Sequence, residues 1–187
     1  YEVTQIEIPN TIKSINNFQF SGFNNIISLI IPKEIIFSGA YAFNVYKNLL
    51  NVYYKGTIED WCNIKFDSID SNPMKYAEHF YMLNEKSEWY EVTQIEISNK
   101  IKSINNFQFC GFDNIMNISI LNSIISIGCS AFSSCSSLTS ITLPKKINFI
   151  DNNVFEECKM LSKVYYKGTV EDWCNITFSS FTSNPMY

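Results

Sequence analysis

The sequence contains no arginine: all 14 of its basic residues are lysines, set against 18 aspartates and glutamates, for a formal net charge of −4. Arginine provides the planar pair of donors that recognises phosphate, carboxylate and guanine. An acidic chain without arginine has no basic stripe to place along a nucleic-acid backbone. We therefore expect no nucleic-acid partner.

Histidine is almost as scarce, because His79 is the single example. Imidazole is the usual general base and a common zinc ligand, so most acid–base and zinc chemistry lacks its normal participant. The six cysteines include no CxxC pair, which argues against structural zinc. We expect no cofactor, no metal site and no enzymatic activity.

Long apolar runs are also absent. Apolar runs such as residues 29–31 fall far short of the roughly 20 residues that span a bilayer, so we expect no transmembrane segment. The chain begins at Tyr1 without a basic segment ahead of an apolar one, so no signal peptide is visible and the sequence resembles part of a longer protein. Its 46% hydrophobic content is enough to build a sizeable core, which excludes a disordered chain.

The chain repeats itself at two scales. Residues 1–28 match residues 90–117 at 22 of 28 positions, and residues 52–74 match residues 164–186 at 18 of 23. One 23-residue unit accounts for both matches, and it starts at Ile6, Leu29, Val52, Ile95, Ile118, Ile141 and Val164. Position 15 of every unit is a phenylalanine: Phe20, Phe43, Phe66, Phe109, Phe132, Phe155 and Phe178. A fixed period of this length is typical of a solenoid.

The pattern within each unit indicates a short strand. Positions 1 and 3 are apolar and would point inward, whereas position 2 would point outward. Proline at position 4 of three units ends the strand, because proline cannot donate to a sheet ladder. We predict a repeat solenoid with a parallel sheet and little helix. Its structural core would contain the seven position-15 phenylalanines together with Trp61 and Trp173. Phe132 would stack between Phe109 and Phe155 in a continuous aromatic spine.

Residues 118–140 (ISILNSIISIGCSAFSSCSSLTS) and 141–163 (ITLPKKINFIDNNVFEECKMLSK) resemble the 23-residue repeat of BspA-like leucine-rich-repeat proteins. The shared pattern is apolar–x–apolar–Pro, then Ile, Ile-Gly, Ala-Phe, Cys and Leu. The segments VYYKGTIEDWCNI at Val52 and VYYKGTVEDWCNI at Val164 resemble the Tyr-Tyr-x-Gly-Thr-x-x-x-Trp segment that closes such arrays. The resemblance implies a right-handed leucine-rich-repeat coil with its parallel β-sheet on the concave face.

Residues 75–94 (KYAEHFYMLNEKSEWYEVTQ) interrupt the 23-residue period. Residues 77–83 are typical of a strand and residues 84–87 of a turn, so we expect a β-hairpin-like connector. It would join a first repeat block, residues 1–74, to a second, residues 95–187. The units at Ile6 and Ile95 also depart from the family pattern, since Gln19 and Gln108 replace the alanine before the phenylalanine.

The resemblance also implies an extracellular or cell-surface location on a host-associated microbe, with adhesion and protein binding as functions. We therefore expect a non-enzymatic interaction module that is a fragment of a larger surface protein and binds a protein ligand. Two alternatives stay open: a glycan-binding surface, and a structural spacer or filament in which the open ends of the coil self-associate end to end.

The outward face of the sheet is the candidate binding surface, because solenoids bind partners along such rows and tyrosine is an effective interface residue. Tyr53 and Tyr165 share position 2 of the two closing units. The other candidates lie at position 2 or just before a strand: Ile30, Glu7, Glu96, Thr142, Asn51 and Lys163.

Three other groups have plainer interpretations. Cys135 and Cys158 share position 18 of neighbouring units, about 5 Å apart if the units stack, but parallel side chains favour two buried thiols over a disulfide. His79 has no neighbouring nucleophile and is interpreted as a surface residue of a strand. Residues 59–60 and 171–172 are paired acids, which would face opposite ways on an extended chain and form solvated turns.

Overall fold

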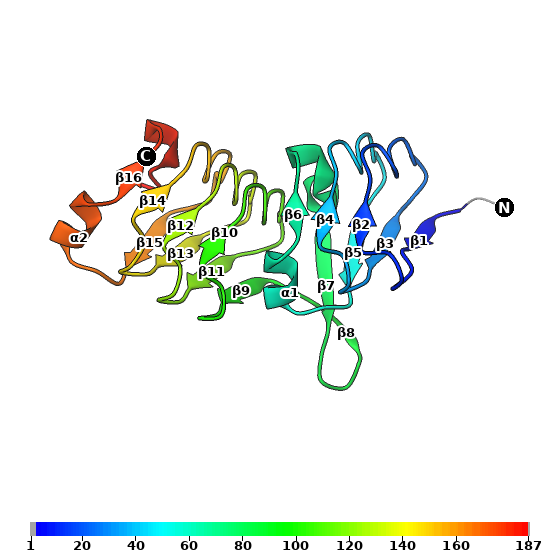
Figure 1. The fold of residues 1–187 in the computed structure, drawn as a ribbon, viewed down its shortest axis with the longest axis horizontal. Helices are drawn as coiled ribbons and strands as arrows, with labels where there is room; N and C mark the ends of the chain where they lie inside the picture. The colour runs from blue at the N-terminus through cyan, green and yellow to red at the C-terminus, as the bar shows by residue number, and fades with distance from the viewer. Residues whose placement is uncertain (1–2, 187) are drawn as a thin grey trace.

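The structure is a computed structural model that describes residues 3–186. It confirms the predicted solenoid: the chain winds into successive coils with strands on two sides and little helix (Figure 1). The long strands on one side are β1 (Gln5–Glu7), β3 (Ser28–Ile31), β5 (Asn51–Tyr54), β7 (His79–Leu83), β9 (Gln94–Ile97), β11 (Asn117–Ile120), β13 (Ser140–Leu143) and β15 (Lys163–Tyr166). The short strands on the other side are β2 (Ser14–Ile15), β4 (Phe37–Ser38), β6 (Lys65–Phe66), β10 (Ser103–Ile104), β12 (Ser126–Ile127), β14 (Phe149–Ile150) and β16 (Thr177–Phe178).

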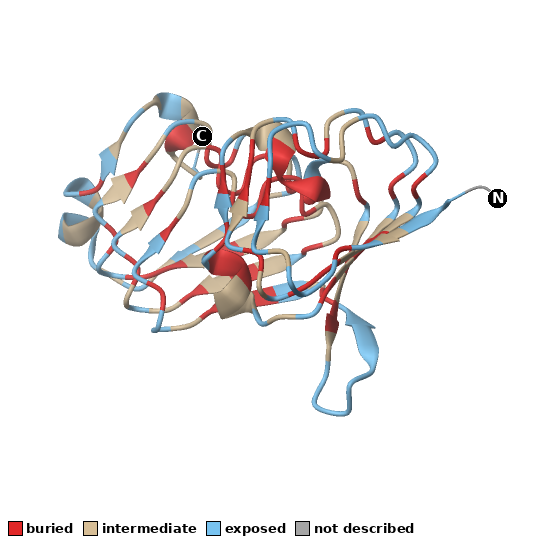
Figure 2. Cartoon of the chain, turned by 45° about the vertical axis from the view of Figure 1, so that its right-hand side comes forward, coloured by how far each residue is buried: buried red, intermediate tan, exposed pale blue. Residues whose placement is uncertain are grey.

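The long strands form two sheets, in the orders β1-β3-β5-β7-β8 and β9-β11-β13-β15, where β8 is Trp89–Glu91. The 23-residue repeat sets the register, since Ile6 pairs with Leu29 and Ile118 pairs with Ile141 in parallel strands. Burial alternates along each strand, so that Leu29 and Ile31 are buried while Ile30 is only half-buried. Buried residues therefore line the inside of the coil between the two rows of strands (Figure 2).

The two closing units contain short helices that the sequence pattern did not predict. Helix α1 (Ile58–Cys62) and helix α2 (Val170–Cys174) each begin at a threonine cap. The Thr57 hydroxyl accepts a hydrogen bond from the Asp60 amide, and the Asp60 carboxylate accepts one from the Thr57 amide. Such reciprocal capping stabilises a helix start. The interpretation of residues 59–60 and 171–172 as acids on an extended turn was therefore wrong, and three 3₁₀ turns (Ile69–Ser71, Pro73–Lys75 and Phe181–Ser183) complete the helical structure.

The helices also displace two of the seven phenylalanines. Phe66 pairs in register with Ser38 instead of Phe43, and Phe178 pairs with Ile150 instead of Phe155. The stack of phenylalanines therefore does not extend into the closing units, because the helical turn takes up the residues between the two strands of each such unit. The Phe66 ring packs 5.6 Å from the Trp61 ring, and the Phe178 ring 5.7 Å from the Trp173 ring, measured between ring centroids.

The remaining phenylalanines stack as two separate series. Phe20 and Phe43 stack at 5.8 Å in the first block. In the second block Phe132 lies between Phe109, at 5.6 Å, and Phe155, at 5.9 Å, with the ring planes nearly parallel. Phe132 is fully buried, whereas Phe20 near one end of the coil is only partly buried because no further coil covers it among the described residues.

Cys135 is a buried thiol and Cys158 is a half-buried one. All six cysteines are free in the structure. The Cys135 thiol donates to the Phe109 carbonyl oxygen at 3.2 Å, and the Cys158 thiol donates to the Phe132 carbonyl oxygen at 3.1 Å. Each side chain therefore reaches back to the preceding coil and acts as a small polar link between neighbouring coils.

Residues 75–94 fold into a strand, a turn and a second strand. β7 extends the first long-strand sheet, because Val52 of β5 pairs with Phe80 in parallel. β8 then pairs with β7 in antiparallel, and the hairpin between them projects from the body of the solenoid (Figure 1). β9 begins a new sheet, so the long-strand surface is divided at the hairpin.

The coil that begins at Ile95 packs directly on the coil that contains Trp61. The Trp61 indole Nε1 donates to the Gln108 carbonyl oxygen at 2.8 Å, and its ring centroid lies 5.6 Å from that of Phe112. Phe80 of β7 fills the same contact, 5.0 Å from Trp61. We call this packing the internal junction.

Candidate functional site

The strand face is the outward surface of the two long-strand sheets. Alternation places position 2 of each strand and the residue before position 1 outside, as the sequence predicts. The strand face comprises Gln5, Glu7, Ser28, Ile30, Asn51, Tyr53, His79 and Tyr81 of the first sheet and Gln94, Glu96, Asn117, Ser119, Ser140, Thr142, Lys163 and Tyr165 of the second.

Three aromatic rings gather on the strand face beside the hairpin, and we call Tyr53, Tyr81 and Trp89 the aromatic cluster. Tyr53 and Tyr81 pair across β5 and β7, and their rings stack with centroids 4.7 Å apart and an interplanar angle of 16°. The hairpin folds Trp89 back so that its ring meets Tyr53 edge-on, with centroids 5.1 Å apart. Trp89 remains exposed and both tyrosines are half-buried, so the cluster is ordered by ring packing and still open to a partner.

Charged and polar groups surround the aromatic cluster. His79 Nδ1 lies 2.7 Å from a Glu91 carboxylate oxygen, and that same oxygen accepts a bond of 2.9 Å from the Asn114 amide. The hydrogen bond with His79 is the main cause that lowers the pKa of Glu91. Across the same sheet Lys55 and Glu7 form an ion pair at 2.6 Å. The cluster therefore has the polar rim that surrounds the apolar centre of many interfaces.

The structure divides the predicted site residues between two sheets. Glu7, Ile30 and Tyr53 lie in one row, because Glu7 pairs with Ile30 and Ile30 with Tyr53. Asn51 pairs with His79 in the neighbouring row of the same sheet. Glu96, Thr142, Lys163 and Tyr165 belong to the second sheet.

Tyr53 and Tyr165 therefore do not meet, although they are repeat equivalents. Tyr165 lies on the last long strand with 55% of its surface exposed. Within residues 3–186 no aromatic ring packs on it, whereas Tyr53 has two such neighbours. The first sheet is the stronger candidate surface.

Three members of this surface were missed from the sequence: Tyr81, Trp89 and Glu91. They lie in residues 75–94, outside the 23-residue period on which the search for a binding row depended. The available signal was the alternation of residues 79–83, in which Phe80 and Met82 are buried and Tyr81 is not. The pairing of Trp89 with this strand depends on the hairpin register and has no counterpart in the repeat.

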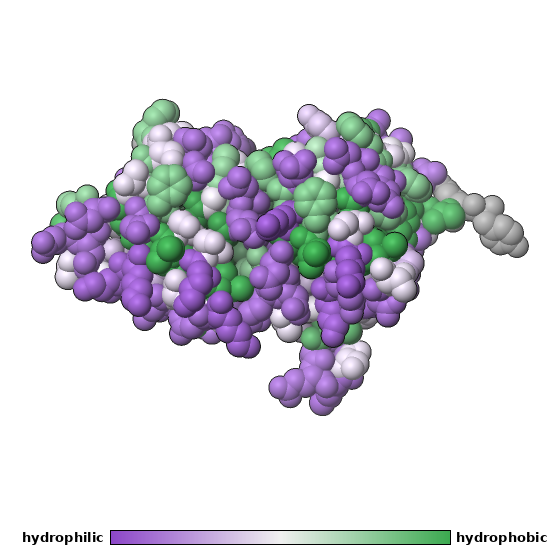
Figure 3. Space-filling view, viewed as in Figure 1, coloured by the Kyte–Doolittle hydropathy of each residue, from purple (hydrophilic) through white to green (hydrophobic). Residues whose placement is uncertain are grey.

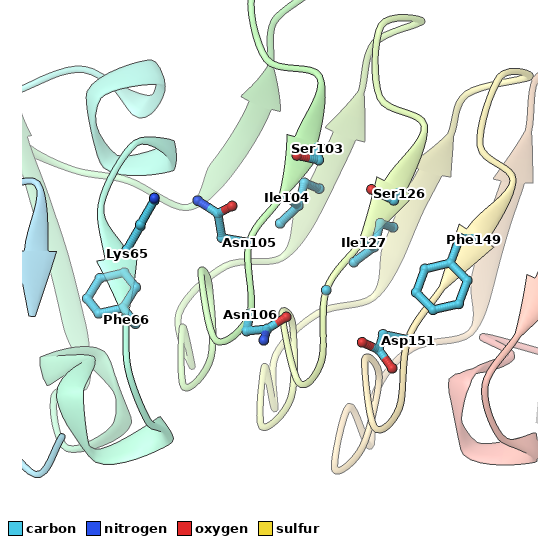
Figure 4. Close-up of a pocket in the computed structure, with 11 residues that line it drawn as sticks. Lys65, Phe66, Ser103, Ile104, Asn105, Asn106, Ser126, Ile127, Phe149 and Asp151 are labelled. Carbon is cyan, nitrogen blue, oxygen red and sulfur yellow. The ribbon is translucent and has the colours of Figure 1, made fainter. Parts of the chain in front are cut away.

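A shallow pocket of about 420 Å³ opens at the internal junction, between β6 and the short strands of the second block (Figure 4). Its polar lining includes Asn105 and Asn106, but both side chains already bind the fold. Asn105 donates to the Cys62 carbonyl oxygen at 3.1 Å, and Asn106 accepts from the Cys129 amide at 2.9 Å. We therefore assign this pocket to the packing of the two blocks.

In the space-filling view apolar side chains lie in small groups among hydrophilic ones, and the hairpin tip is largely hydrophilic (Figure 3).

Two kinds of feature are absent from the described part of the chain. Among residues 3–186 no three His, Cys, Asp or Glu side chains gather where they would hold a metal ion. Over the same residues no helix has the length and apolarity needed to cross a bilayer.

Comparisons with known proteins agree with this architecture. The BspA type leucine-rich-repeat region matches residues 1–87 and 86–184, in six copies. The structure is similar to that of a leucine-rich repeat protein from Bacteroides ovatus, with a TM-score of 0.56 and 21% identity, over 87% of this chain and 37% of that one. The likeness shows the fold, and this chain spans little more than a third of the Bacteroides protein.

Two further structures have lower scores. A leucine-rich repeat protein of T. pallidum gives a TM-score of 0.48 at 14% identity, over 98% of this chain and 79% of that one. A leucine rich cell surface protein from Faecalibacterium prausnitzii gives 0.34 at 16% identity, over 95% and 63%. No curated protein matches this chain.

Proposed function

The chain belongs to the BspA-type leucine-rich-repeat family, and we propose that it is a non-enzymatic protein-binding module of a larger microbial cell-surface protein. In this proposal residues 1–74 and 95–187 are two repeat blocks, and residues 75–94 join them and contribute to the binding surface. An adhesive role fits a rigid coil that presents its side chains in fixed rows.

The observation that carries the proposal is the aromatic cluster on the strand face. Tyr and Trp dominate the binding energy of many protein interfaces, because each buries a large area and has few rotors to order. Here the rings of Tyr53, Tyr81 and Trp89 are fixed by packing on one another on regular strands. Little conformational entropy would be lost when a partner covers them.

The orientation of the rings favours a protein ligand over a glycan. Sugars stack on aromatic rings whose faces are open. Tyr53 and Tyr81 cover one face of each other, with an interplanar angle of 16°, and Trp89 meets Tyr53 edge-on. The cluster therefore presents ring edges and hydroxyl groups within a rim that includes the His79–Glu91 pair. Such an edge suits the mixed apolar and polar surface of a protein.

The test is a protein pull-down from extracellular-matrix extracts, run beside a glycan array, with Tyr81→Ser and Trp89→Ser variants. Each variant should weaken capture of a protein partner by about tenfold, since an anchor truncation costs about 1–2 kcal/mol. Tyr165→Ser is the matched control, because Tyr165 is an exposed tyrosine of the second sheet outside the cluster. Equal loss for the control, or ligands found on the glycan array alone, would contradict the proposal.

A further inference from the structure

The same closing sequence occurs in the middle of the chain and at its C-terminal end, in two different environments. Residues 52–74 and 164–186 agree at 18 of 23 positions. Trp61 and Cys62 are buried, whereas Trp173 is half-buried and Cys174 is exposed. Met74 is 0% exposed and its equivalent Met186 is 66% exposed. The internal copy is covered by the coil that begins at Ile95 and by Phe80 of the connector.

The coil that begins at Ile6 has nearly the same sequence as that covering coil. Phe112 is 0% exposed at the internal junction, and its equivalent Phe23 is 45% exposed at the N-terminal end. Gly111 packs so closely that an added Cβ would lie 2.5 Å from the Met74 carbonyl oxygen. The equivalent Gly22 has the same positive φ and nothing within 4 Å of its Cβ position. Inside the chain, the surface of the Ile95 coil packs on Trp61. The equivalent surface of the Ile6 coil is exposed at the N-terminal end.

The residues that make hydrogen bonds across the internal junction have the same residue types at the equivalent positions of the two chain ends. Trp61 Nε1 donates to the Gln108 carbonyl oxygen at 2.8 Å, and Asn72 Nδ2 donates to the Phe107 carbonyl oxygen at 2.8 Å. The equivalents of these four residues are Trp173 and Asn184 at one end of the chain and Gln19 and Phe18 at the other.

A third bond has equivalents as well. Asn105 Nδ2 donates to the Cys62 carbonyl oxygen at 3.1 Å, and the matching pair is Asn16 and Cys174. Among the described residues Trp173 Nε1 and Asn184 Nδ2 have no acceptor of this kind. Each end of the chain therefore holds one half of a junction whose complete form is present in the middle.

We propose that two copies of this chain associate head to tail, with the C-terminal closing coil of one copy packed on the Ile6 coil of the next, as in the internal junction. Trp173 would then lie against Phe23 of the neighbouring copy, as Trp61 lies against Phe112. The two contacting surfaces differ from each other, so the contact is heterologous and repeats into a linear assembly. The proposal uses the ends of the coil, and it is independent of the strand face.

Two contacts of the internal junction have no counterpart between separate copies. Phe80 of β7, which packs 5.0 Å from Trp61, belongs to the connector. A hydrogen bond with Ser98 and the charge of Lys100 lower the pKa of Glu59, but the residues at the matching positions are Pro9 and Thr11. We therefore expect an association weaker than the internal junction and visible as a concentration-dependent equilibrium.

The experiment is sedimentation velocity on the 187-residue chain up to about 1 mM, the weak end of measurable association. The unaltered chain should form dimers and longer oligomers as concentration rises. Phe23→Glu alters the N-terminal end and Met186→Lys alters the C-terminal end, so each variant alone should remain monomeric. An equimolar mixture of the two variants should recover dimers and nothing longer, because it contains one intact surface of each kind.

Two matched controls separate this result from a general effect of added charge. Ile125→Glu and Ile125→Lys alter an exposed apolar side chain in the middle of the second block, and each should associate like the unaltered chain. An unaltered chain that stays monomeric at every concentration would overturn the proposal. It would favour the alternative that a further block of the same polypeptide packs on the exposed ends of the coil. Dimers of either single variant would also overturn the proposal, since they would indicate a symmetric contact.

Discussion

Phe112 and Phe23 offer a direct test of the internal junction, because they are the same residue of two nearly identical repeats. Phe112 is fully buried, and its ring centroid lies 4.9 Å from that of Phe80, 5.4 Å from that of Phe109 and 5.6 Å from that of Trp61. Phe23 is exposed and contacts one ring, that of Phe20 at 6.3 Å.

The expected losses of stability differ several-fold. Burial of a phenylalanine contributes about 1.5–3 kcal/mol, and a ring left beside a cavity loses further contacts, so Phe112→Ala should cost about 3–5 kcal/mol. Phe23→Ala should cost about 0.5–1.5 kcal/mol, because Phe23 keeps almost half of its surface in water and loses a single ring contact.

The assay is urea denaturation followed by tryptophan fluorescence, at a low protein concentration at which the chain is monomeric. The slope of the free energy against urea should be the same for both variants, so that the difference in midpoint reports stability alone. Equal losses at the two positions would refute the structure of the junction. A loss below about 1 kcal/mol for Phe112→Ala would mean that the two blocks do not pack on each other.

Further predictions concern the stacked phenylalanines, the cysteines and the His79–Glu91 contact. Phe132→Ala should cost about 3–5 kcal/mol in chemical denaturation, because the ring is stacked on both sides, and Phe20→Ala should cost clearly less. Alkylation under denaturing conditions should detect six free thiols by mass spectrometry, and a reducing agent should leave the melting temperature unchanged. Cys174 should react with iodoacetamide in the native protein well before Cys62, because burial raises the pKa of the Cys62 thiol to about 12. Glu91 has a lowered pKa, so its contact with His79 contributes above the ordinary carboxyl range and is lost as the pH falls through the lowered value. The protection of β8 amides from hydrogen exchange, relative to the intrinsic rate at each pH, should therefore fall in acid, and it should not do so in Glu91→Gln.

The spacing of apolar residues determined the coil and its register. From β1 to β5 and from β9 to β15, paired residues of the long strands lie 23 positions apart, as in Leu29 with Val52 and Ile141 with Val164. The sequence suffices here because a coil is a local structure, and its neighbour in space is its neighbour in the repeat. The outward placement of position 2 follows from the same alternation, and so does the exposure of Tyr165.

The closing units show where spacing alone misleads. Phe66 and Phe178 keep the position-15 spacing, yet neither joins the stacked phenylalanines. The threonine and aspartate at Thr57 and Asp60 start a helix, and that signal was present in the sequence as a Thr-x-x-Asp pattern. Local capping therefore overrode the repeat at these two positions.

Only the tertiary structure decided which copies of a repeated residue are covered. Gln108 is buried against Trp61 and Gln19 lies in water, although the sequence around them is the same. The aromatic cluster has the same origin, since Trp89 reaches Tyr53 through the fold of the hairpin and through no spacing in the chain. Burial depends on what stacks next along the solenoid axis, and a repeat cannot encode its own neighbour when one unit stands in the middle of the coil and its twin stands at the end.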